Sequence, residues 1–318
     1  MNYLTSNIKQ LEKDTLNNIK LSKSKNTIRA YKSDFTDFVN FCKKNSLKSL
    51  PADYKTVSIY ITQLFKNKQK LSTIKRKLVS ISVIHKIKGY YIDIKNPAIV
   101  ENFLGIKRQI GVAQKGKRPL TIENLKKIIN SINSNELSLT RKLRDKTILL
   151  IGFAGGFRRS EITNLNYEDI DFVNEGVKIK IKKSKTDQFG EGFTKAIPYF
   201  KNEEFCPVIT LKKMLETSKI INGGIFRRIS KSGKVLTNSL TDQNVALILK
   251  KYLAIAGLEN INFSGHSLRS GFATVSAESG ADERSIMNMT GHKSTEMVRR
   301  YIKESNLFKN NPLNKISF

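Results

Sequence analysis

One short segment of the chain alternates strictly between apolar and basic residues. It runs from Val177 to Lys182 with the sequence Val-Lys-Ile-Lys-Ile-Lys. Because successive side chains of a strand point to opposite faces, this alternation predicts a β-strand with one buried face. A polar stretch with two glycines follows, and residues 193–198 then return to a strand-like pattern. The two segments together predict a β-hairpin.

Most other patterned segments have the period of a helix. In residues 24–44, apolar side chains recur at spacings of three and four, which predicts an amphipathic helix with Cys42 in its buried stripe. Similar patterns predict helices over residues 54–66, 72–84 (opening at Ser72 as N-cap), 121–132, 143–154, 208–217, 241–256, 267–279, 283–289 and 295–305. Gly291 fits a helix C-terminal stop. The predicted fold class is therefore mainly α with a small β-sheet.

Length and pattern divide the chain into three parts. With 318 residues, the chain is long enough for about two domains. Residues 1–106 predict a small helical bundle with basic outer faces, closed by Gly89 and Pro97. Residues 107–118 contain five basic residues, two glycines and no acid, which predicts an extended basic linker. Residues 119–318 combine helices with the hairpin and form a second, mixed domain.

The chain carries a large positive charge, formally +30. Residues 1–118 hold 25 Lys and Arg against 7 Asp and Glu, hence +18 of that total. A lysine-rich, AT-biased composition explains part of the excess, and the remainder favours a polyanionic partner, namely nucleic acid. Eight basic residues are candidates for contacts with a phosphate backbone: Lys25, Arg29, Lys75, Arg76, Lys77, Lys115, Lys117 and Arg118.

Neither a membrane nor a disulfide framework is indicated. No window approaches the roughly 18 consecutive apolar residues that a membrane span needs, and the first residues lack the apolar core of a secretory signal. We therefore expect a cytoplasmic protein without membrane contact. The two cysteines, Cys42 and Cys206, are too few for a disulfide framework or a cysteine-rich zinc site.

Three short stretches combine residue types suited to phosphate chemistry. Residues 154–162 place Arg158 after a glycine-containing bend and before a helix. Residues 264–271 contain His266 and Arg269, three residues apart and hence on one helix face, where two donors can converge on an anion. In residues 290–301, a histidine precedes a tyrosine by nine positions, and these two residues are His292 and Tyr301.

Each stretch alone is weak evidence, because a lone arginine, His-x-x-Arg pair or helical tyrosine is usually structural. Their conjunction is stronger. The chain has three histidines, and two of them fall inside these stretches, each directly after a glycine that permits close backbone approach to a ligand. The third, His85, is predicted to have a structural role.

The set resembles the tyrosine recombinase (phage integrase) family, whose hallmark is Arg…Lys…His-x-x-Arg…His…Tyr. Gly-Phe-Arg158 is similar to the first arginine box of the family, although Arg159 duplicates the arginine. Lys185, in Ser-Lys-Thr-Asp within the predicted hairpin, matches the catalytic lysine, with Lys195 as a weaker rival. The resemblance covers residues 119–305 well and the front bundle more loosely. The matching residues are Arg158, Lys185, His266, Arg269, His292 and Tyr301.

The resemblance implies a helical core-binding (SAM-like) domain at 1–106 and an α+β catalytic domain at 119–318. It implies that Tyr301 attacks a phosphodiester of double-stranded DNA and forms a 3′-phosphotyrosyl link, so that strands are exchanged through a Holliday junction. Two arginines would replace a metal cation on the phosphate, so no metal and no cofactor is expected. A homotetramer, or a heterotetramer with a related recombinase, would act on two DNA sites. The apolar tail, with Leu307, Ile316 and Phe318, is expected to dock on a neighbouring protomer.

Two other classes of function stay open at this point. A type IB topoisomerase has a similar pocket, but the His-x-x-Arg pair and the two-domain length favour a recombinase. A non-catalytic DNA-binding protein, such as a decayed recombinase, is the other alternative. The intact set of six residues argues against decay. A nuclease would not stay covalently joined to its product.

Overall fold

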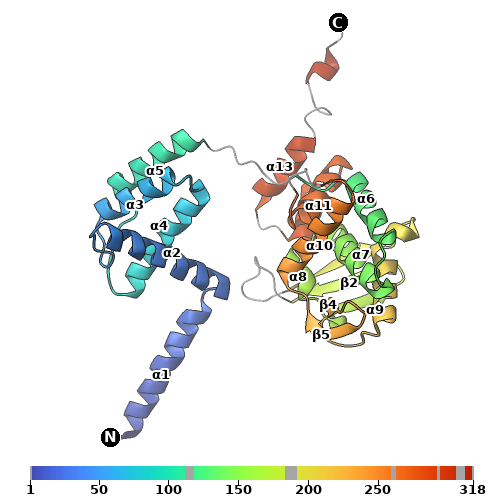
Figure 1. Ribbon diagram of the computed structural model, residues 1–318, viewed down its shortest axis with the longest axis horizontal. Coiled ribbons are helices and arrows are strands. Elements are labelled where there is room, and N and C mark those ends of the chain that lie inside the picture. The colour runs from blue at the N-terminus through green and yellow to red at the C-terminus, as the bar shows by residue number, and fades with distance from the viewer. Residues whose placement is uncertain are drawn as a thin grey trace. The chain divides into compact units, whose positions relative to one another are not determined.

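The computed structural model describes residues 2–111, 118–182, 192–258, 263–291, 294–305 and 312–316. It divides into two compact units, residues 1–114 and 115–318, and helices dominate both (Figure 1). This agrees with the predicted fold class. Within these residues, no helix has the length and apolar character needed to cross a membrane.

The N-terminal unit is a helical bundle. Helices α2 to α5 pack on one another around a core that includes Phe38, Tyr60 and Ile81, and Cys42 is buried there as predicted. Ser24 caps α2, because its hydroxyl accepts a hydrogen bond from the backbone of Thr27. The helices of the unit are α1 (Asn2–Leu21), α2 (Lys25–Lys44), α3 (Tyr54–Lys66), α4 (Leu71–Ile87) and α5 (Pro97–Ile110).

Several predicted boundaries in this unit are wrong. Helix α1 was not predicted, and α4 begins at Leu71, so Ser72 lies inside the helix and Lys70 is the N-cap. Pro97 opens α5 rather than closing the region, because proline fits the first helical turn and Asn96 caps it. Helix α5 then continues to Ile110, so the first four residues of the predicted linker are helical.

The C-terminal unit contains the predicted hairpin. Strands β2 (Gly176–Ile181) and β3 (Phe193–Pro198) are antiparallel, with Ile179 opposite Lys195. The alternation holds, because Val177, Ile179 and Ile181 are buried whereas the lysines between them are exposed. A short strand that was not predicted, β1 (Ile170–Val173), pairs with the other side of β2. A second small hairpin, also not predicted, joins β4 (Arg227–Ile229) to β5 (Val235–Ser239).

Helix α7 lies at the centre of this unit. Ile148 and Ile151 on one side contact the core that also covers the three-stranded sheet, while Leu149 and Phe153 contact a second core. The helices are α6 (Ile122–Asn133), α7 (Leu139–Ala154), α8 (Arg159–Thr163), α9 (Pro207–Ser218), α10 (Asp242–Ile255), α11 (Ser267–Glu278), α12 (Glu283–Thr290) and α13 (Thr295–Ser305). All of them were predicted from the sequence, and the short α8 is the helix expected directly after Arg158. Gly291 ends α12 in a left-handed conformation, as expected.

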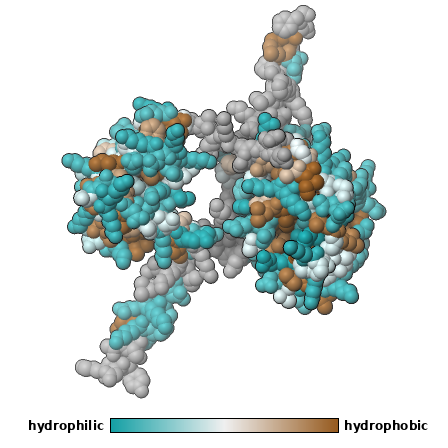
Figure 2. Space-filling view, in the orientation of Figure 1, coloured by the Kyte–Doolittle hydropathy of each residue, from teal (hydrophilic) through white to brown (hydrophobic). Residues whose placement is uncertain are grey.

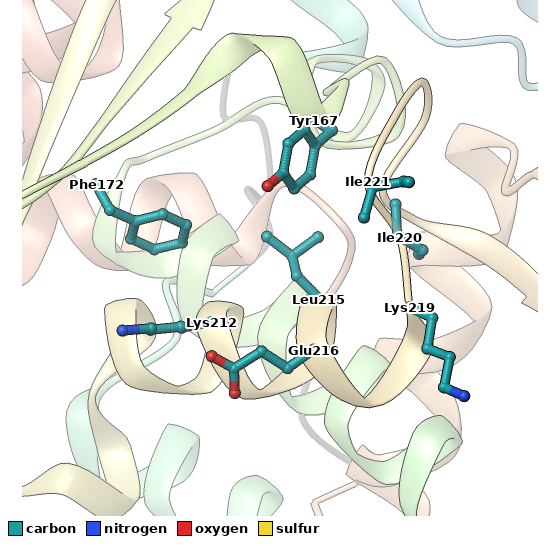
Figure 3. Close-up of a pocket in the computed structure, with 8 residues that line it drawn as sticks. All are labelled: Tyr167, Phe172, Lys212, Leu215, Glu216, Lys219, Ile220 and Ile221. Carbon is teal, nitrogen blue, oxygen red and sulfur yellow. The ribbon is translucent and has the colours of Figure 1, made fainter.

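Hydrophilic side chains dominate the visible face of the N-terminal unit, and hydrophobic patches interrupt the face of the C-terminal unit (Figure 2). One surface depression of the C-terminal unit has a volume of about 410 Å³. It lies beside α9, where Tyr167 and Phe172 face Leu215 (Figure 3). Its lining is Tyr167, Phe172, Lys212, Leu215, Glu216, Lys219, Ile220 and Ile221. None of the predicted site residues belongs to this lining.

Candidate active site

The candidate site is built around the bend that joins α7 to α8. Gly156 has a φ of 55°, in the left-handed region that favours glycine. A Cβ there would lie 3.0 Å from the ring of Phe272 and 3.1 Å from the methyl group of Thr290. A Cβ on Gly155 would lie 2.1 Å from the ring of Phe157. The two glycines therefore let the bend pass between α11 and the end of α12.

Arg158 leaves this bend as the N-cap of α8. Its guanidinium contacts Glu161, with Nη1 to Oε1 at 2.6 Å, and its backbone N–H donates to the other oxygen of the same carboxylate at 2.9 Å. Glu161 thus holds the local structure of the bend. Nη2 of Arg158 donates to the carbonyl oxygen of Gly291 at 3.3 Å. The side chain of Arg158 is 12% exposed, so its charge is largely desolvated.

Arg269 reaches the same bend from α11. It is buried, and its Nη1 donates to the carbonyl oxygen of Gly156 at 2.9 Å. Nη2 is also buried, and it has no hydrogen-bond acceptor among the residues that the structure describes. Burial, reinforced by the nearby charge of Arg158, lowers the pKa of Arg269 to about 10, and Glu161 and Tyr301 oppose that shift. The side chain is therefore charged at neutral pH and holds one N–H group suited to an anionic oxygen.

Lys195 is the third cation at the bend. It is 1% exposed, and its Nζ donates to the carbonyl oxygen of Gly155 at 2.5 Å. The ammonium also lies 4.2 Å from the centre of the Phe157 ring. The sequence carried a signal for this burial, because Lys195 precedes the apolar Ile197 by two residues in a strand. The family resemblance alone makes Lys195 only a weaker rival to Lys185.

Tyr301 enters the site from α13. It is partly buried against a small cluster that includes Ala273 and Ile286, and so packs on α11 and α12. It lies near enough to Arg269 to interact with its charge. Three elements far apart in the sequence thus bring a phenol and two guanidiniums together.

The remaining predicted residues are placed differently. His266 is the N-cap of α11 and is exposed, whereas Arg269, three residues on, is buried. Arg159 does not join the cluster, because its guanidinium pairs with Asp242, with Nη2 3.7 Å from the carboxylate. Its side chain passes so close to Gly265 that a Cβ on that glycine would lie 2.2 Å from Cδ of Arg159. Arg158 is therefore the arginine of the pair that enters the site. Lys185 and His292 lie outside the described residues.

Comparison with known proteins places this cluster in a family. Residues 118–307 match the model of the phage integrase family, and residues 16–88 match the phage integrase N-terminal SAM-like domain. The chain belongs to the phage integrase family. An integrase/recombinase xerD homolog of Selenomonas ruminantium is 41% identical over 298 residues, which cover 93% of this chain and 86% of that protein.

Solved structures show the same fold as this phage integrase family member. The XerH site-specific recombinase bound to palindromic difH substrate superposes with a TM-score of 0.59 at 21% identity, over 83% of this chain and 70% of that one. A lambda integrase dimer bound to a COC′ core site gives a TM-score of 0.60 at 17% identity, over 100% and 84% of the two chains. At these identities the likeness concerns the fold alone.

The basic residues predicted to contact DNA fall into two groups. Arg76 is engaged within the N-terminal unit, because its guanidinium makes two hydrogen bonds, at 2.8 and 2.9 Å, to the buried carboxylate of Asp34. Lys77 is also engaged within this unit, because its ammonium pairs with the carboxylate of Asp37. Lys75 and Arg118 are exposed, and so is Arg29, which also donates to Asn26. Lys115, Lys117 and the side chain of Lys25 lie outside the described residues.

Within the described part of the chain, no three His, Cys, Asp or Glu side chains gather closely enough to hold a metal ion. His85 is buried as a structural residue, as predicted. Its Nε2 accepts from the backbone N–H of Ala52 at 2.9 Å, and its Nδ1 donates to the carbonyl oxygen of Ile81 at 2.8 Å.

Proposed function

We propose that this chain is a site-specific DNA recombinase that cleaves and rejoins DNA through a 3′-phosphotyrosyl intermediate and exchanges strands through a Holliday junction. One observation carries the proposal. The largely desolvated guanidiniums of Arg158 and Arg269 lie at one bend, and Tyr301 lies beside Arg269. One N–H group of Arg269 has no acceptor among the described residues. Such a cluster is suited to a phosphate oxygen.

The charge of the cluster favours an anion. Arg158, Arg269 and Lys195 bring three cations to the bend, and Glu161 is the carboxylate that acts on them in the described structure. Desolvated charges need a partner of opposite sign. A DNA phosphodiester supplies one, and the planar fork of an arginine can donate to both of its non-bridging oxygens.

Tyr301 is the nucleophile in this proposal. A bond forms between its phenol oxygen and phosphorus, and the bond between phosphorus and the 5′-oxygen breaks. The nearby guanidiniums favour the phenolate at the moment of attack and stabilise the additional negative charge of the pentacoordinate transition state. The 3′-phosphotyrosyl link conserves the energy of the phosphodiester, so the reverse attack by a 5′-hydroxyl rejoins a strand.

The other predicted residues complete the proton transfers. Lys185 is assigned as the general acid that donates a proton to the departing 5′-oxygen. His292 donates a hydrogen bond to a phosphate oxygen, and His266 assists proton transfer or positions the phosphate. The exposed position of His266 at the start of α11 leaves it accessible to a DNA strand.

Recombination needs two DNA sites and therefore an assembly. We propose a homotetramer, or a heterotetramer with a related recombinase, in which each site binds two protomers. The C-terminal tail is proposed to dock on a neighbouring protomer. Leu313 and Ile316, the apolar side chains of the tail that the structure describes, are 60% and 52% exposed, and exposed apolar side chains of this kind are suited to packing on another protein surface.

The test is covalent trapping on a nicked suicide substrate, in which the cleaved end diffuses away and the protein stays attached. A library of such duplexes, incubated with the full chain, should yield a protein–DNA adduct whose sequencing reveals the preferred site. Tyr301→Phe should abolish the adduct, and the exposed Tyr167→Phe should leave it unchanged. Adduct formation by Tyr301→Phe would refute the proposal. Relaxation of supercoils without exchange between two sites would instead indicate a topoisomerase.

A further inference from the structure

Lys195 is an unusual residue because its charged end is fully buried. Lysine is almost never fully buried unless its ammonium is paired with an opposite charge. The side chain of Lys195 contacts the carbonyl oxygen of Gly155 and the faces of the Phe157 and Phe193 rings. In the described structure, no carboxylate lies within ion-pair distance of its Nζ. Burial of this group therefore costs free energy, which the hydrogen bond to Gly155 and the two ring contacts offset without a partner of opposite charge.

The charged groups that face Lys195 come from two elements. Glu161 and Arg158 lie at the start of α8, and Arg269 comes from α11. On the neighbouring strand β2 the residue opposite Lys195 is Ile179, and the lysines of β2 point to the other face. Lys195 thus belongs to the same electrostatic cluster as the two arginines, beneath the bend that carries Arg158.

Each of the three cationic side chains donates a hydrogen bond to the backbone carbonyl oxygen of a glycine. Lys195 donates to Gly155, Arg269 donates to Gly156, and Arg158 donates to Gly291. Two of the three therefore fix consecutive carbonyl groups of the bend. A shift of Lys195 would move the bend, and with it the backbone from which Arg158 projects.

We propose that Lys195 is a positioning residue of the phosphate site: it fixes the Gly155–Gly156 bend from below and takes up a proton from solvent when a phosphate-like anion binds. The inference rests on the proposed function. It differs from the role assigned to Lys185, because Lys195 is 1% exposed and its Nζ is held by the carbonyl oxygen of Gly155, whereas Lys185 is assigned a proton transfer to the departing 5′-oxygen.

The electrostatics support this role. Burial lowers the pKa of Lys195; Glu161 opposes this shift and the charges of Arg269 and Arg158 reinforce it, and the net pKa is about 7. At pH 8 the ammonium of the free protein is therefore largely deprotonated. An anion bound to the arginines adds negative charge nearby and raises the pKa. Between the free and bound values, binding is coupled to uptake of one proton, which restores the third positive charge under the phosphate.

The first experiment measures proton uptake without any DNA. Sulfate, which does not titrate in this range, is bound to the full chain at pH 6 and pH 8 in buffers with different ionisation enthalpies, and calorimetry gives the protons exchanged. The wild type should take up more protons at pH 8 than at pH 6. Lys195→Met should lack that increment, and so should Lys195→Arg, which keeps a permanent charge. Equal uptake by the wild type and a folded Lys195→Met would overturn the inference.

The second experiment measures the rate of adduct formation against pH with the suicide duplex recovered by trapping. The wild-type rate should fall above neutral pH as Lys195 deprotonates. Lys195→Met should be slower by about tenfold or more at neutral pH and lack that fall. Lys195→Arg should recover most of the rate and also lack the fall. A merely structural lysine would change the melting temperature but leave the shape of the pH profile intact, and that result would refute the role.

Two further outcomes are distinguishable. A wild-type chain that never becomes attached to DNA, yet shows sulfate-linked proton uptake at Lys195, would overturn the proposed function alone. If neither Lys195 variant folds, the same calorimetric measurement of proton uptake is made on a chain with His266→Asn and His292→Asn. Lys195 then remains in the cluster as a group that can titrate near neutral pH. Absence of uptake at pH 8 in that chain would overturn the inference, and its presence would support it.

Discussion

Replacing Glu161 by glutamine should destabilise the C-terminal unit in a way that an anion repairs. The carboxylate of Glu161 is 1% exposed and accepts two hydrogen bonds from Arg158, at 2.6 Å from the guanidinium and 2.9 Å from the backbone N–H. Glutamine has nearly the same shape and keeps one acceptor oxygen. The change therefore removes the charge, and one of the two hydrogen bonds, with little change in packing.

The magnitude follows from the burial of the pair. Removing one partner of a buried ion pair costs roughly 3–5 kcal/mol, because the other charge is left uncompensated. The hydrogen bond that glutamine retains returns about 1 kcal/mol. The expected loss is thus roughly 2–4 kcal/mol in the free energy of unfolding, which lowers the melting temperature of a unit of this size by roughly 5–15 °C.

The assay is thermal unfolding followed by circular dichroism, with and without sulfate. Because the variant leaves Arg158, Arg269 and Lys195 without their carboxylate, sulfate should raise its melting temperature more than that of the wild type. A matched control is Glu283→Gln, since Glu283 pairs with the 69% exposed Arg299 at 3.0 Å on the surface. That pair is worth about 0–1 kcal/mol. If Glu161→Gln melts with the control, the argument from buried charge is refuted.

Three further predictions concern other parts of the chain. Burial lowers the pKa of His85, so the folded state binds this proton less readily than the unfolded state. The contribution of the neutral His85 to the free energy of unfolding should therefore be complete above about pH 6.5. It should fall by up to about 1.4 kcal/mol per pH unit as the pH drops below that value. Urea unfolding at several pH values checks this, and His85→Gln should flatten the dependence. Gly265→Ala should lower the free energy of unfolding by roughly 1–3 kcal/mol, because the new methyl group would contact the side chain of Arg159. In a double-mutant cycle, Arg159→Ala should relieve most of that loss, and strictly additive effects would contradict the contact. Arg76→Met should lower the free energy of unfolding by roughly 1–2 kcal/mol, because it removes the partner of the buried Asp34. Lys75→Met should leave the free energy of unfolding unchanged and weaken salt-dependent DNA binding, because Lys75 is exposed. The opposite pattern in urea unfolding and DNA-binding assays would contradict a structural role for Arg76 and a DNA-contacting role for Lys75.

Local patterns in the sequence were sufficient for most of the helices and for the central hairpin. The stripe of residues 24–44 and the alternation of residues 177–182 are set by the period of the backbone, so they can be read without tertiary information. Short strands were missed, among them β1 and β4, because a few residues do not establish a period. The role of Pro97 was misread, because proline suits both the end of one segment and the first turn of the next.

The sequence by itself determined which residue types this phage integrase family member has for phosphate chemistry, and in which order. The family was indicated by the order and spacing of six residues together, namely Arg158, Lys185, His266, Arg269, His292 and Tyr301. Only the tertiary structure decided which of two adjacent arginines enters the site and that Lys195 joins it. Those outcomes depend on which backbone carbonyl groups and rings come together from α8, α11 and β3. Contacts between segments so distant in the chain have no period and no local signature, so they exist only once the cores have packed.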